Sequence, residues 1–467
     1  MIITIRILEL NKQYFYESGE AVTFLKVMEA LGLTFYRPCG GKGTCGNCRI
    51  KVDGVEQLGC KTVLKKDCII EVPVKLTGQI SVPLDSFAVT DLDTVAVDIG
   101  TTTIGVSYGS LSCAVANSQG GYGADVVSRL QAAAEDGKAA ETMMNMVRAD
   151  ITRAMEEIGA QAAHKIVVSA NTTMGHLLMG YPTDGLGAYP FKPYSLNLES
   201  QVWGNRTLTL MPGISAYVGA DIVSGAYVLN MVSDSDVKLL MDLGTNAELL
   251  LWNGERFFAT SAAAGPALEG GNLSCGMASV KGAVSHLEFD NEGGLKLQVI
   301  GDEKPQGLCG SAVIDLVAEL KDAGLLDEGG LFTDESYQEG KGFPVAEEVF
   351  FSQEDVQQVI LAKSAIKSAI EVLCQEAGVE LSEISKLYVA GGLGTSVKAK
   401  SAVKLGLIPS ELEGVFQAVG NTSLKGAIKF SREKNTAVLE EIISKTTVTD
   451  LGNSDLFQKL FLENLTI

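Results

Sequence analysis

Four cysteines near the amino terminus have a spacing that suits metal binding: Cys39, Cys45, Cys48 and Cys60, within PCGGKGTCGNCRIKVDGVEQLGCKT. The first three follow the pattern C-x5-C-x2-C, and the glycines between them let the backbone turn sharply. Thiolates crowded on one such loop are typical ligands of an iron-sulfur cluster. A structural zinc site more often uses two separated C-x2-C pairs, so the pattern favours iron-sulfur over zinc.

The fourth ligand is open between two cysteines. Cys60 follows a glycine in a predicted turn, whereas Cys68 begins the apolar run CIIEVPV, which is typical of a strand. We therefore predict Cys60 as the fourth ligand and Cys68 as a bystander. The spacing of the first three cysteines resembles that of adrenodoxin-like ferredoxins, which implies a 2Fe-2S cluster.

The segments around these cysteines predict a small domain. MIITIRIL and QYFY predict a strand pair, AVTFLKVMEALG a helix, and RIKV and CIIEVPV further strands. This order suits a β-grasp ferredoxin fold over residues 1–75. Residues 76–93 contain Gly78 and Pro83 and show no helical period, so we expect a linker there.

A second pattern occurs twice further along the chain. TVAVDIGTTTIGVSYG at 94–109 and LLMDLGTNAELLLW at 239–252 each combine an apolar strand, Asp-x-Gly-Thr and another apolar strand. Such a turn can bind phosphate through N–H groups and hydroxyls while its carboxylate holds hydrated Mg²⁺. One copy is most often an ordinary turn, but two copies predict related halves. The candidates are Asp98, Gly100, Thr101 and Thr102, and Asp242, Gly244 and Thr245.

Further candidates follow in the second half of the chain. The segment KLYVAGGLGTSV predicts a strand that leads into Gly391, Gly392 and Gly394, which would let the backbone approach a nucleotide closely. Gly310 and Ser311 open the apolar helix AVIDLVAEL and are further nucleotide candidates. Weaker candidates are Asn171 and Thr172, where a helix cap is the ordinary interpretation, and Glu269, whose role is open between partner contact, hinge, water orientation and plain solvation.

The two Asp-x-Gly-Thr segments and the segment KLYVAGGLGTSV resemble, respectively, the two phosphate loops and the adenosine loop of the ASKHA superfamily of kinases, chaperone ATPases and actin. The resemblance implies two α/β subdomains, each with a mixed five-stranded sheet, that bind ATP and Mg²⁺. We expect subdomain I over 94–235 and subdomain II over 236–467, with Asp98 and Asp242 as catalytic residues that handle Mg²⁺ and the attacking water. The predicted fold class is therefore α+β in the amino-terminal domain and α/β in the remainder.

A cluster domain joined to such an ATPase resembles the reductive activators of corrinoid proteins. The segments SANTTMGHLLMG, AAAGPALEGGN and GLCGSAVIDL agree with that family. The resemblance implies ATP-dependent return of cobalt(II) to cobalt(I) in a corrinoid protein or corrinoid-dependent methyltransferase, with an external low-potential electron donor. A homodimer is left open. This chain is shorter than expected for such activators, so we expect it to lack a middle domain.

Two other functions remain open. One is an ATP-gated electron donor to another low-potential metalloenzyme, and the other is a small-molecule kinase with an appended redox domain. A kinase should phosphorylate a free metabolite, whereas an activator should hydrolyse ATP slowly and respond to a protein partner.

Composition restricts the setting of the protein. The 467 residues are 46% hydrophobic, enough for several globular domains. The net charge of -20 argues against a nucleic-acid partner. The sequence shows neither a secretory signal pattern nor an apolar run that approaches 18 residues, so we expect no membrane association. Cysteines grouped at one metal-type site suit a reducing compartment, which predicts a cytoplasmic protein.

Overall fold

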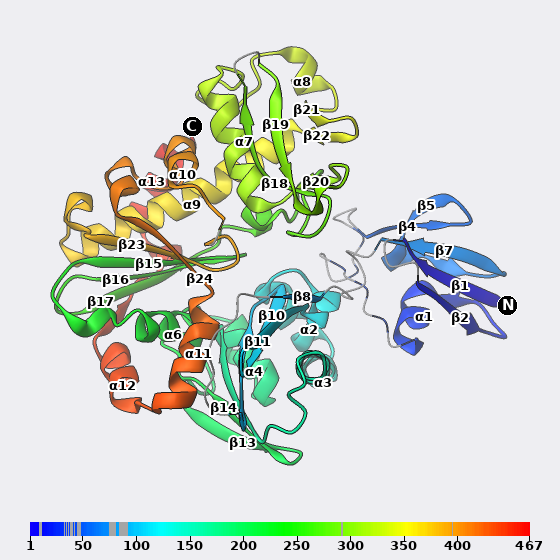
Figure 1. Cartoon of the computed structure of the whole chain (residues 1–467), viewed down its shortest axis with the longest axis horizontal. Coiled ribbons are helices and arrows are strands. Elements are labelled where there is room, and N and C mark those ends of the chain that lie inside the picture. Colours follow the sequence, from blue (N-terminus) through cyan, green and yellow to red (C-terminus); the bar gives the residue numbers. More distant parts are fainter. Residues whose placement is uncertain are drawn as a thin grey trace. The chain divides into compact units, whose positions relative to one another are not determined.

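The computed structural model describes the chain apart from residues 9–11, 32, 34, 36, 38–40, 42, 44–47, 74–80, 84–91, 291–292 and 395, and apart from the side chains of 81–83 and 339. Its contacts divide the chain into two compact units (Figure 1). Unit 1 comprises Met1–Asp221 and Leu424–Lys434, and unit 2 comprises Ile222–Ser423 and Asn435–Ile467. Each unit contains one of the two Asp-x-Gly-Thr motifs.

The amino-terminal residues form a five-stranded sheet in the order β2-β1-β7-β4-β5. Its central strands β1 (Ile2–Ile7) and β7 (Cys68–Val72) are parallel, and each has an antiparallel neighbour on its other side. Helix α1 (Phe24–Ala30) belongs to the same hydrophobic core. This arrangement confirms the predicted β-grasp topology. The other strands are β2 (Lys12–Glu17), β4 (Arg49–Val52), β5 (Val55–Leu58), β3 (Val22–Thr23) and β6 (Val63–Leu64).

A seven-stranded sheet in the order β13-β14-β12-β9-β10-β11-β8 forms the rest of the framework of unit 1. Its central strand β9 (Thr94–Ile99) is parallel to β12 (Lys165–Ala170) and antiparallel to β10 (Thr103–Tyr108). Both β9 and β12 are buried along nearly their whole length, as expected of parallel strands covered on both faces. The remaining strands are β8 (Ser81–Pro83), β11 (Leu111–Ala116), β13 (Glu199–Trp203) and β14 (Arg206–Leu210).

Unit 2 contains a six-stranded sheet in the order β24-β23-β15-β16-β17-β25. Its central strand β15 (Lys238–Leu243) is parallel to β23 (Lys386–Ala390) and antiparallel to β16 (Ala247–Trp252). The remaining strands are β17 (Phe257–Ala262), β24 (Phe416–Gly420) and β25 (Thr446–Val448).

The two large sheets share one topology. In each, three successive strands form an antiparallel meander, and the first of them pairs in parallel with a later strand that has a further parallel neighbour. The predicted repeat is therefore confirmed at the level of topology. The expectation of five strands per sheet is wrong, because β8 and β13 extend one sheet and β25 extends the other. These three strands lie outside the repeated motif.

Smaller elements complete unit 2. A three-stranded sheet has the order β19-β18-β20, and β21 and β22 form a hairpin. Helix α7 (Gly310–Asp322) packs against β18 and against α10 (Ala399–Leu405). The strands are β18 (Ala283–Phe289), β19 (Leu295–Val299), β20 (Gly307–Leu308), β21 (Phe343–Ala346) and β22 (Val349–Phe351).

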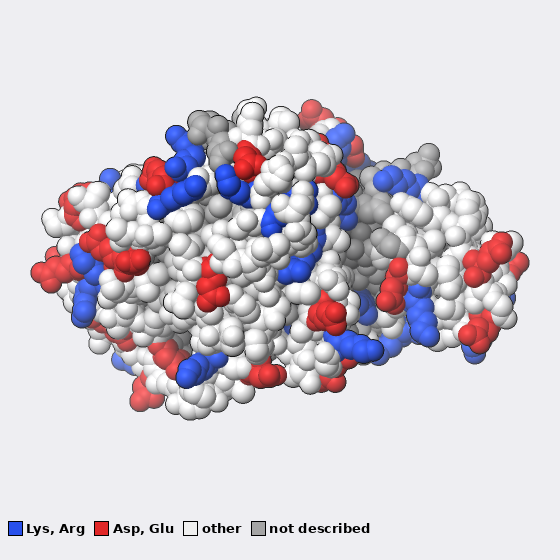
Figure 2. Space-filling view, turned by 90° about the horizontal axis from the view of Figure 1, so that it is seen from below, with Lys and Arg blue, Asp and Glu red and all other residues white. Residues whose placement is uncertain are grey.

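The remaining helices of the two units range from the single turn of α5 to about seven turns in α9. None of the described helices is long and apolar enough to cross a membrane. On the face shown in Figure 2, acidic and basic side chains are interspersed among the described residues. The helices are α2 (Val126–Glu135), α3 (Ala139–Glu157), α4 (Thr172–Met179), α5 (Asp184–Gly187), α6 (Ala220–Val228), α8 (Glu335–Glu339), α9 (Gln353–Ala377), α11 (Thr422–Glu433), α12 (Thr436–Ser444) and α13 (Asp455–Glu463).

Helix α9 packs against β16 and β17 and is buried along most of its length. A capping box begins it: the Asp355 N–H donates to Ser352 Oγ at 3.1 Å, and the Asp355 carboxylate accepts from the Ser352 N–H at 2.9 Å. The same buried carboxylate accepts from the Ser274 N–H at 2.7 Å. Asp355 therefore both caps α9 and ties a distant loop to it.

We expect Asp355→Ala to lower the free energy of unfolding by about 2–3 kcal/mol, because it removes the cap and leaves the Ser274 N–H without its partner. Urea denaturation followed by circular dichroism measures this change. Glu354→Ala is the matched control, since Glu354 is exposed on the same turn and its loss should change stability by less than about 0.5 kcal/mol. Equal effects of the two substitutions would contradict the assigned role.

Candidate functional site

The two Asp-x-Gly-Thr motifs occupy equivalent places in the two large sheets. Asp98 lies near the carboxyl end of β9, beside Ser169 of the parallel strand β12. Asp242 lies near the carboxyl end of β15, beside Ala390 of the parallel strand β23. Both aspartate side chains are half-buried. Open α/β sheets bind ligands outside the carboxyl ends of their strands, where strand order reverses, and each motif lies at such a strand end.

Backbone bonds hold both turns. The Gly100 N–H donates to the Thr103 carbonyl at 2.9 Å, and the Gly244 N–H donates to the Asn246 carbonyl at 3.0 Å. A Cβ on Gly100 would lie 3.0 Å from the Thr103 carbonyl oxygen, so a side chain there would crowd the turn. The next residue in each motif is a threonine, Thr101 and Thr245, and further side chains hold each of these in place.

Thr101 is supported by two side chains. The fully buried Arg129 of α2 donates to the Thr101 carbonyl at 2.5 Å, and the Asn171 amide donates to Thr101 Oγ1 at 3.3 Å. Asn171 Oδ1 also accepts from the Met174 N–H at 2.9 Å, so its cap on α4 is confirmed. Sequence reasoning does not identify Arg129, because a lone arginine in an amphipathic helix gives no sign of burial. Thr102 is exposed.

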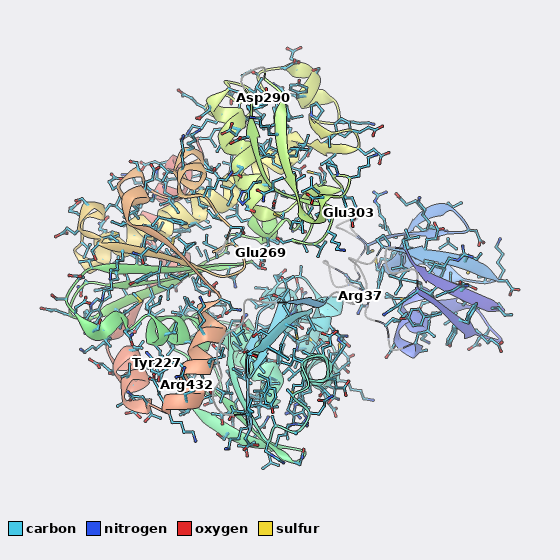
Figure 3. All side chains as sticks on the ribbon, viewed as in Figure 1. Arg37, Tyr227, Glu269, Asp290, Glu303 and Arg432 are labelled. Carbon is cyan, nitrogen blue, oxygen red and sulfur yellow. The ribbon has the colours of Figure 1, made fainter. Side chains whose placement is uncertain are left out.

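Thr245 is supported by an acid instead. Its hydroxyl donates to Glu269 Oε2 at 2.7 Å, and Glu269 ends the short 3-10 turn Pro266–Glu269 after β17. Figure 3 shows Glu269 beside the strand ends of this sheet. Desolvation raises the pKa of Glu269 above its ordinary value, although the bond from Thr245 opposes the shift. The half-buried carboxyl therefore lies against the turn that follows Asp242.

The loop that follows β23 and contains Gly391, Gly392 and Gly394, here called the glycine loop, lies directly against the Asp-x-Gly-Thr motif that begins at Asp242. Gly391 has φ +88°, and a Cβ there would lie 2.5 Å from the Leu243 carbonyl oxygen and 2.6 Å from Asp242 Oδ1. A Cβ on Gly394 would likewise lie 2.4 Å from a backbone carbonyl oxygen. Gly392 differs, because no described atom lies within 4 Å of the place its Cβ would take. The loop thus packs tightly at two glycines and is open at the third.

The start of α7 packs closely against the turn that contains Glu269. A Cβ on Gly310 would lie 1.7 Å from the Leu268 carbonyl oxygen, so only glycine fits there. The buried Ser311 hydroxyl donates to the Ser285 carbonyl at 2.7 Å. Ser311 therefore holds α7 against β18, and Gly310 permits the close packing.

Cys48 and Cys60 are the two predicted cluster ligands that the structure describes, while Cys39 and Cys45 lie outside the described residues. The Gly59 N–H donates to the Cys48 carbonyl at 2.8 Å, so Cys60 lies in the turn that follows this contact. The described residues contain no group of three side chains suited to a metal ion. The hairpin of β4 and β5 nevertheless places Cys48, the residue before β4, opposite Gly59, the residue before Cys60.

Cys68 lies elsewhere in the same sheet. Lys51 of β4 is opposite Glu71 of the antiparallel strand β7. Cys48 lies three residues before Lys51, and Cys68 lies three residues before Glu71. Because the two strands run in opposite directions, the two cysteines lie on opposite sides of this pair. At about 3.3 Å per residue they are separated by roughly 20 Å along the sheet. Burial also raises the pKa of the Cys68 thiol. This register favours Cys60 over Cys68 as the fourth ligand.

Two mixed sheets of one topology, each with an Asp-x-Gly-Thr turn at the carboxyl end of its central strand, define an ASKHA-type protein. Residues 236–467 match the family model of the C-terminal ASKHA domain of RACo, and residues 94–234 match that of the RACo middle region. The chain is 30% identical over 416 residues to the corrinoid activation enzyme RamQ of Eubacterium limosum, covering 79% of this chain and 69% of RamQ. The chain belongs to the RACo family of reductive activators of corrinoid proteins.

Two further similarities agree with this assignment. The chain is 27% identical over 292 residues to the [Co(II) methylated amine-specific corrinoid protein] reductase of Methanosarcina barkeri, covering 56% of this chain and 53% of that protein. A solved structure of a reductive activator for corrinoid, iron-sulfur protein superposes with a TM-score of 0.74 and 23% identity, covering 100% of this chain and 98% of that one. At that identity the likeness shows the fold.

The family match overturns one expectation. We expected no room for a middle domain, but the RACo middle region matches residues 94–234. This is the stretch that we assigned to ASKHA subdomain I, and it contains most of the seven-stranded sheet. Length alone is misleading here, because the middle region is itself the first copy of the repeated topology.

Substitution of Gly392 tests whether the open side of the glycine loop binds a nucleotide. We expect Gly392→Ala to fold normally and to weaken ATP binding roughly tenfold, because a methyl group would occupy space that the ligand needs. Isothermal titration calorimetry measures the affinity. Gly414→Ala is the matched control, since Gly414 is exposed and has equally free space for a Cβ. Unchanged affinity in Gly392→Ala would remove this residue from the binding surface.

Proposed function

We propose that this protein is an ATP-dependent reductive activator that returns the cobalt(II) centre of a corrinoid protein, or of a corrinoid-dependent methyltransferase, to cobalt(I). One observation carries the proposal: a β-grasp domain with cysteines on both sides of its β4–β5 hairpin and an ASKHA fold with two equivalent turns occur in one chain. The names of the two curated relatives support a corrinoid acceptor.

The nucleotide would bind at the turns and the glycine loop. Thr101 and Thr102 would hold phosphates through N–H groups and hydroxyls, and Thr245 would do so through its N–H. Gly100 and Gly244 would shape the two turns around the ligand, because their N–H groups donate to carbonyls within those turns. Asp98 and Asp242 would handle Mg²⁺ and the attacking water. The open space at Gly392 supports a ligand on that side of the loop. The remaining candidates, Gly310, Ser311, Gly391 and Gly394, would support this surface through their contacts within the protein.

Cys39, Cys45, Cys48 and Cys60 would hold a 2Fe-2S cluster. The described half of this donor set fits, because the Gly59–Cys48 backbone bond brings the residue before β4 next to the turn that contains Cys60. When bound, the cluster would supply single electrons that an external low-potential donor replaces. The chain's own contribution is the hairpin that orients Cys48 and Cys60.

ATP is needed because the electron transfer is unfavourable alone. A ferredoxin-type cluster normally has a higher potential than the cobalt(II)/cobalt(I) couple, and each 59 mV of deficit costs about a factor of ten in the equilibrium constant. Tighter binding of the cobalt(I) state would offset part of the deficit, and an ATP-dependent conformational change would form and release the complex.

We place this activity in the cytoplasm, since cysteines grouped at one site suit a reducing compartment. The proposal is compatible with a homodimer.

An anaerobic absorbance assay tests the proposal. The reduced protein is mixed with a cobalt(II) corrinoid protein, with and without Mg-ATP, and we expect the cobalt(I) spectrum only with ATP. Asp242→Asn should lower ATP hydrolysis by about a hundredfold or more, because the carboxylate can no longer bind the cation. Asp236→Asn is the matched control, since Asp236 is exposed just before the same strand. Full hydrolysis by Asp242→Asn would refute the assignment, and no cobalt(I) with several corrinoid proteins would point to another acceptor.

Replacement of single cysteines tests the fourth cluster ligand. We expect Cys60→Ser to lose most of the visible absorbance of a reconstituted 2Fe-2S cluster, because serine is a poor replacement for a thiolate ligand. Cys68→Ser should retain that absorbance, since its side chain lies at the far end of β7. Absorbance and iron content of the two proteins, prepared in parallel, decide the question. The reverse result would show that the sheet register does not determine ligand choice.

A further inference from the structure

The glycine loop of unit 2 must keep its shape between two fixed ends. It begins where β23 ends at Ala390 and finishes where α10 begins at Ala399. The Gly391 N–H donates to the Gly420 carbonyl at 3.3 Å, which fixes the first end to the neighbouring strand. The tight contacts of Gly391 with Leu243 and Asp242 restrict the same end. The other end lies outside the sheet and needs a different support.

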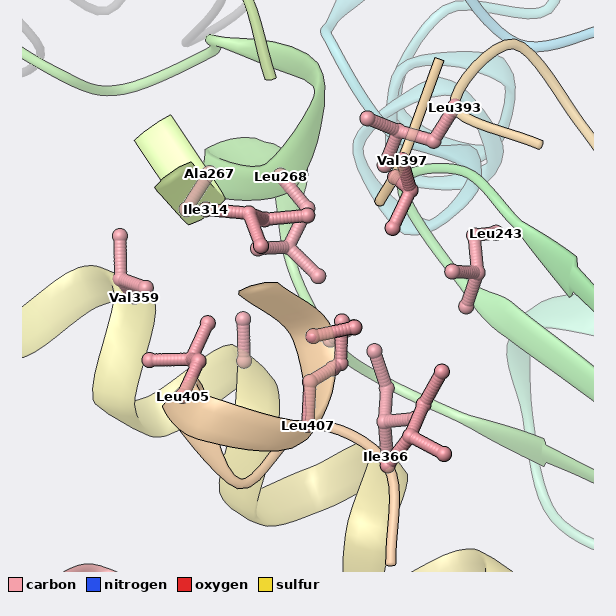
Figure 4. Packing of buried hydrophobic residues seen from close by; sticks show 14 of the residues in the cluster. Leu243, Ala267, Leu268, Ile314, Val359, Ile366, Leu393, Val397, Leu405 and Leu407 are labelled. Carbon is pink, nitrogen blue, oxygen red and sulfur yellow. The ribbon is translucent and has the colours of Figure 1, made fainter. Parts of the chain in front are cut away.

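Core packing supports the middle of the loop. Leu393 and Val397 are buried, and the Val397 N–H donates to the Leu393 carbonyl at 3.1 Å. Figure 4 shows both side chains in the cluster that contains Leu268 and Ile314. A Cβ on Gly310 would lie 2.7 Å from a Leu393 methyl carbon, so α7 lies directly behind the loop. The loop therefore depends on how α7 and α10 are held together.

A buried carboxylate on α7 makes that connection. Asp315 Oδ1 accepts from the Ser401 hydroxyl at 2.5 Å, and Asp315 Oδ2 is 3.0 Å from Lys398 Nζ. Lys398 is the residue immediately before α10, and Ser401 lies in its first turn. The His286 ring Nδ1 of β18 lies 2.8 Å from the same Oδ2. Three groups from two other elements thus meet one side chain that is 2% exposed.

The contacts keep this carboxylate ionised. Burial alone would raise the pKa of Asp315, but the hydrogen bonds from His286, Ser401 and Lys398 lower it below the ordinary value. Removal of one partner of a buried, well-paired charge strongly destabilises the folded protein, because the remaining charge is left uncompensated. The fixed position of Asp315 therefore depends on Lys398 and Ser401, and their positions depend on Asp315 in turn.

We infer that Asp315 is a positioning residue for the nucleotide: by binding Lys398 and Ser401 it fixes the end of the glycine loop and thereby sets nucleotide affinity. This inference rests on the proposed function, because it assumes that the loop binds ATP. Asp315 itself need not touch the ligand. Its loss should weaken ATP and ADP equally, since the loop contacts the part that the two nucleotides share, and should leave the rate at saturating ATP within about twofold.

A pair of lysine substitutions on α10 tests the inference. Lys398 is 46% exposed, so Lys398→Met should fold, and we expect it to raise the Kd of ATP and of ADP roughly five- to tenfold. Lys404→Met is the matched control, because Lys404 pairs with Glu319 and Asp322 of α7 at the opposite end of α10. We expect the control to lower the melting temperature similarly and to leave both Kd values unchanged.

Asp315→Asn completes the test, because asparagine keeps the shape of the side chain and removes its charge. We expect Asp315→Asn and the double variant with Lys398→Met to weaken both nucleotides by about the same factor, since the two residues act through one contact. Calorimetric titration of the full-length protein measures each affinity. If the wild type binds no ATP, the proposed function and the inference both fail. If the wild type binds ATP and the two variants bind it equally well, or if Lys404→Met weakens it as much, the inference alone fails.

Discussion

The parallel pairing of β15 with β23 is the constraint on which the site of unit 2 depends. It places Asp242 beside Ala390, so the motif at the end of one strand meets the glycine loop at the end of the other. The approach is close enough that a Cβ on Gly391 would collide with the Leu243 carbonyl. A register shift of one residue would turn every side chain of β15 to the opposite face and would move Asp242 away from the loop.

The same constraint operates in unit 1, but the two turns have diverged chemically. Pairing of β9 with β12 places Asp98 beside Ser169, and the residue after β12, Asn171, contacts the Thr101 turn. The buried, positively charged side chain of Arg129 supports the Thr101 turn, whereas the acidic side chain of Glu269 supports the Thr245 turn. Arg129 also donates to the Gly123 carbonyl, so its role is to fix the backbone. Glu269 uses one oxygen for Thr245 and is half-buried, so the two turns are held by groups of opposite charge.

The sequence predicts best those features that depend on local patterns of residue types along the chain. Alternating and continuous apolar runs predict four of the β-grasp strands and the two strands around each Asp-x-Gly-Thr turn, and the glycine-rich segment predicts the loop after β23. Arg129 and Asp315 are single polar residues in helices, and only tertiary packing shows that each is buried with partners. The preference for Cys60 over Cys68 has a stronger reason in the sheet register than in the local sequence, since long-range pairing determines how far Cys68 lies from Cys48.

Close packing at a glycine is common to both proposed centres. A Cβ on Gly310 would lie 1.7 Å from a carbonyl oxygen. A Cβ on Gly59, the residue before Cys60, would lie 2.5 Å from the Phe35 ring. Each glycine permits a contact that positions a neighbouring segment, although neither needs to touch a ligand. A related chain that kept every aspartate, threonine and cysteine of the two centres, but had larger residues at these glycines, would lose this geometry. The polar residues therefore define the chemistry, and the glycines decide whether the backbone can bring those residues together.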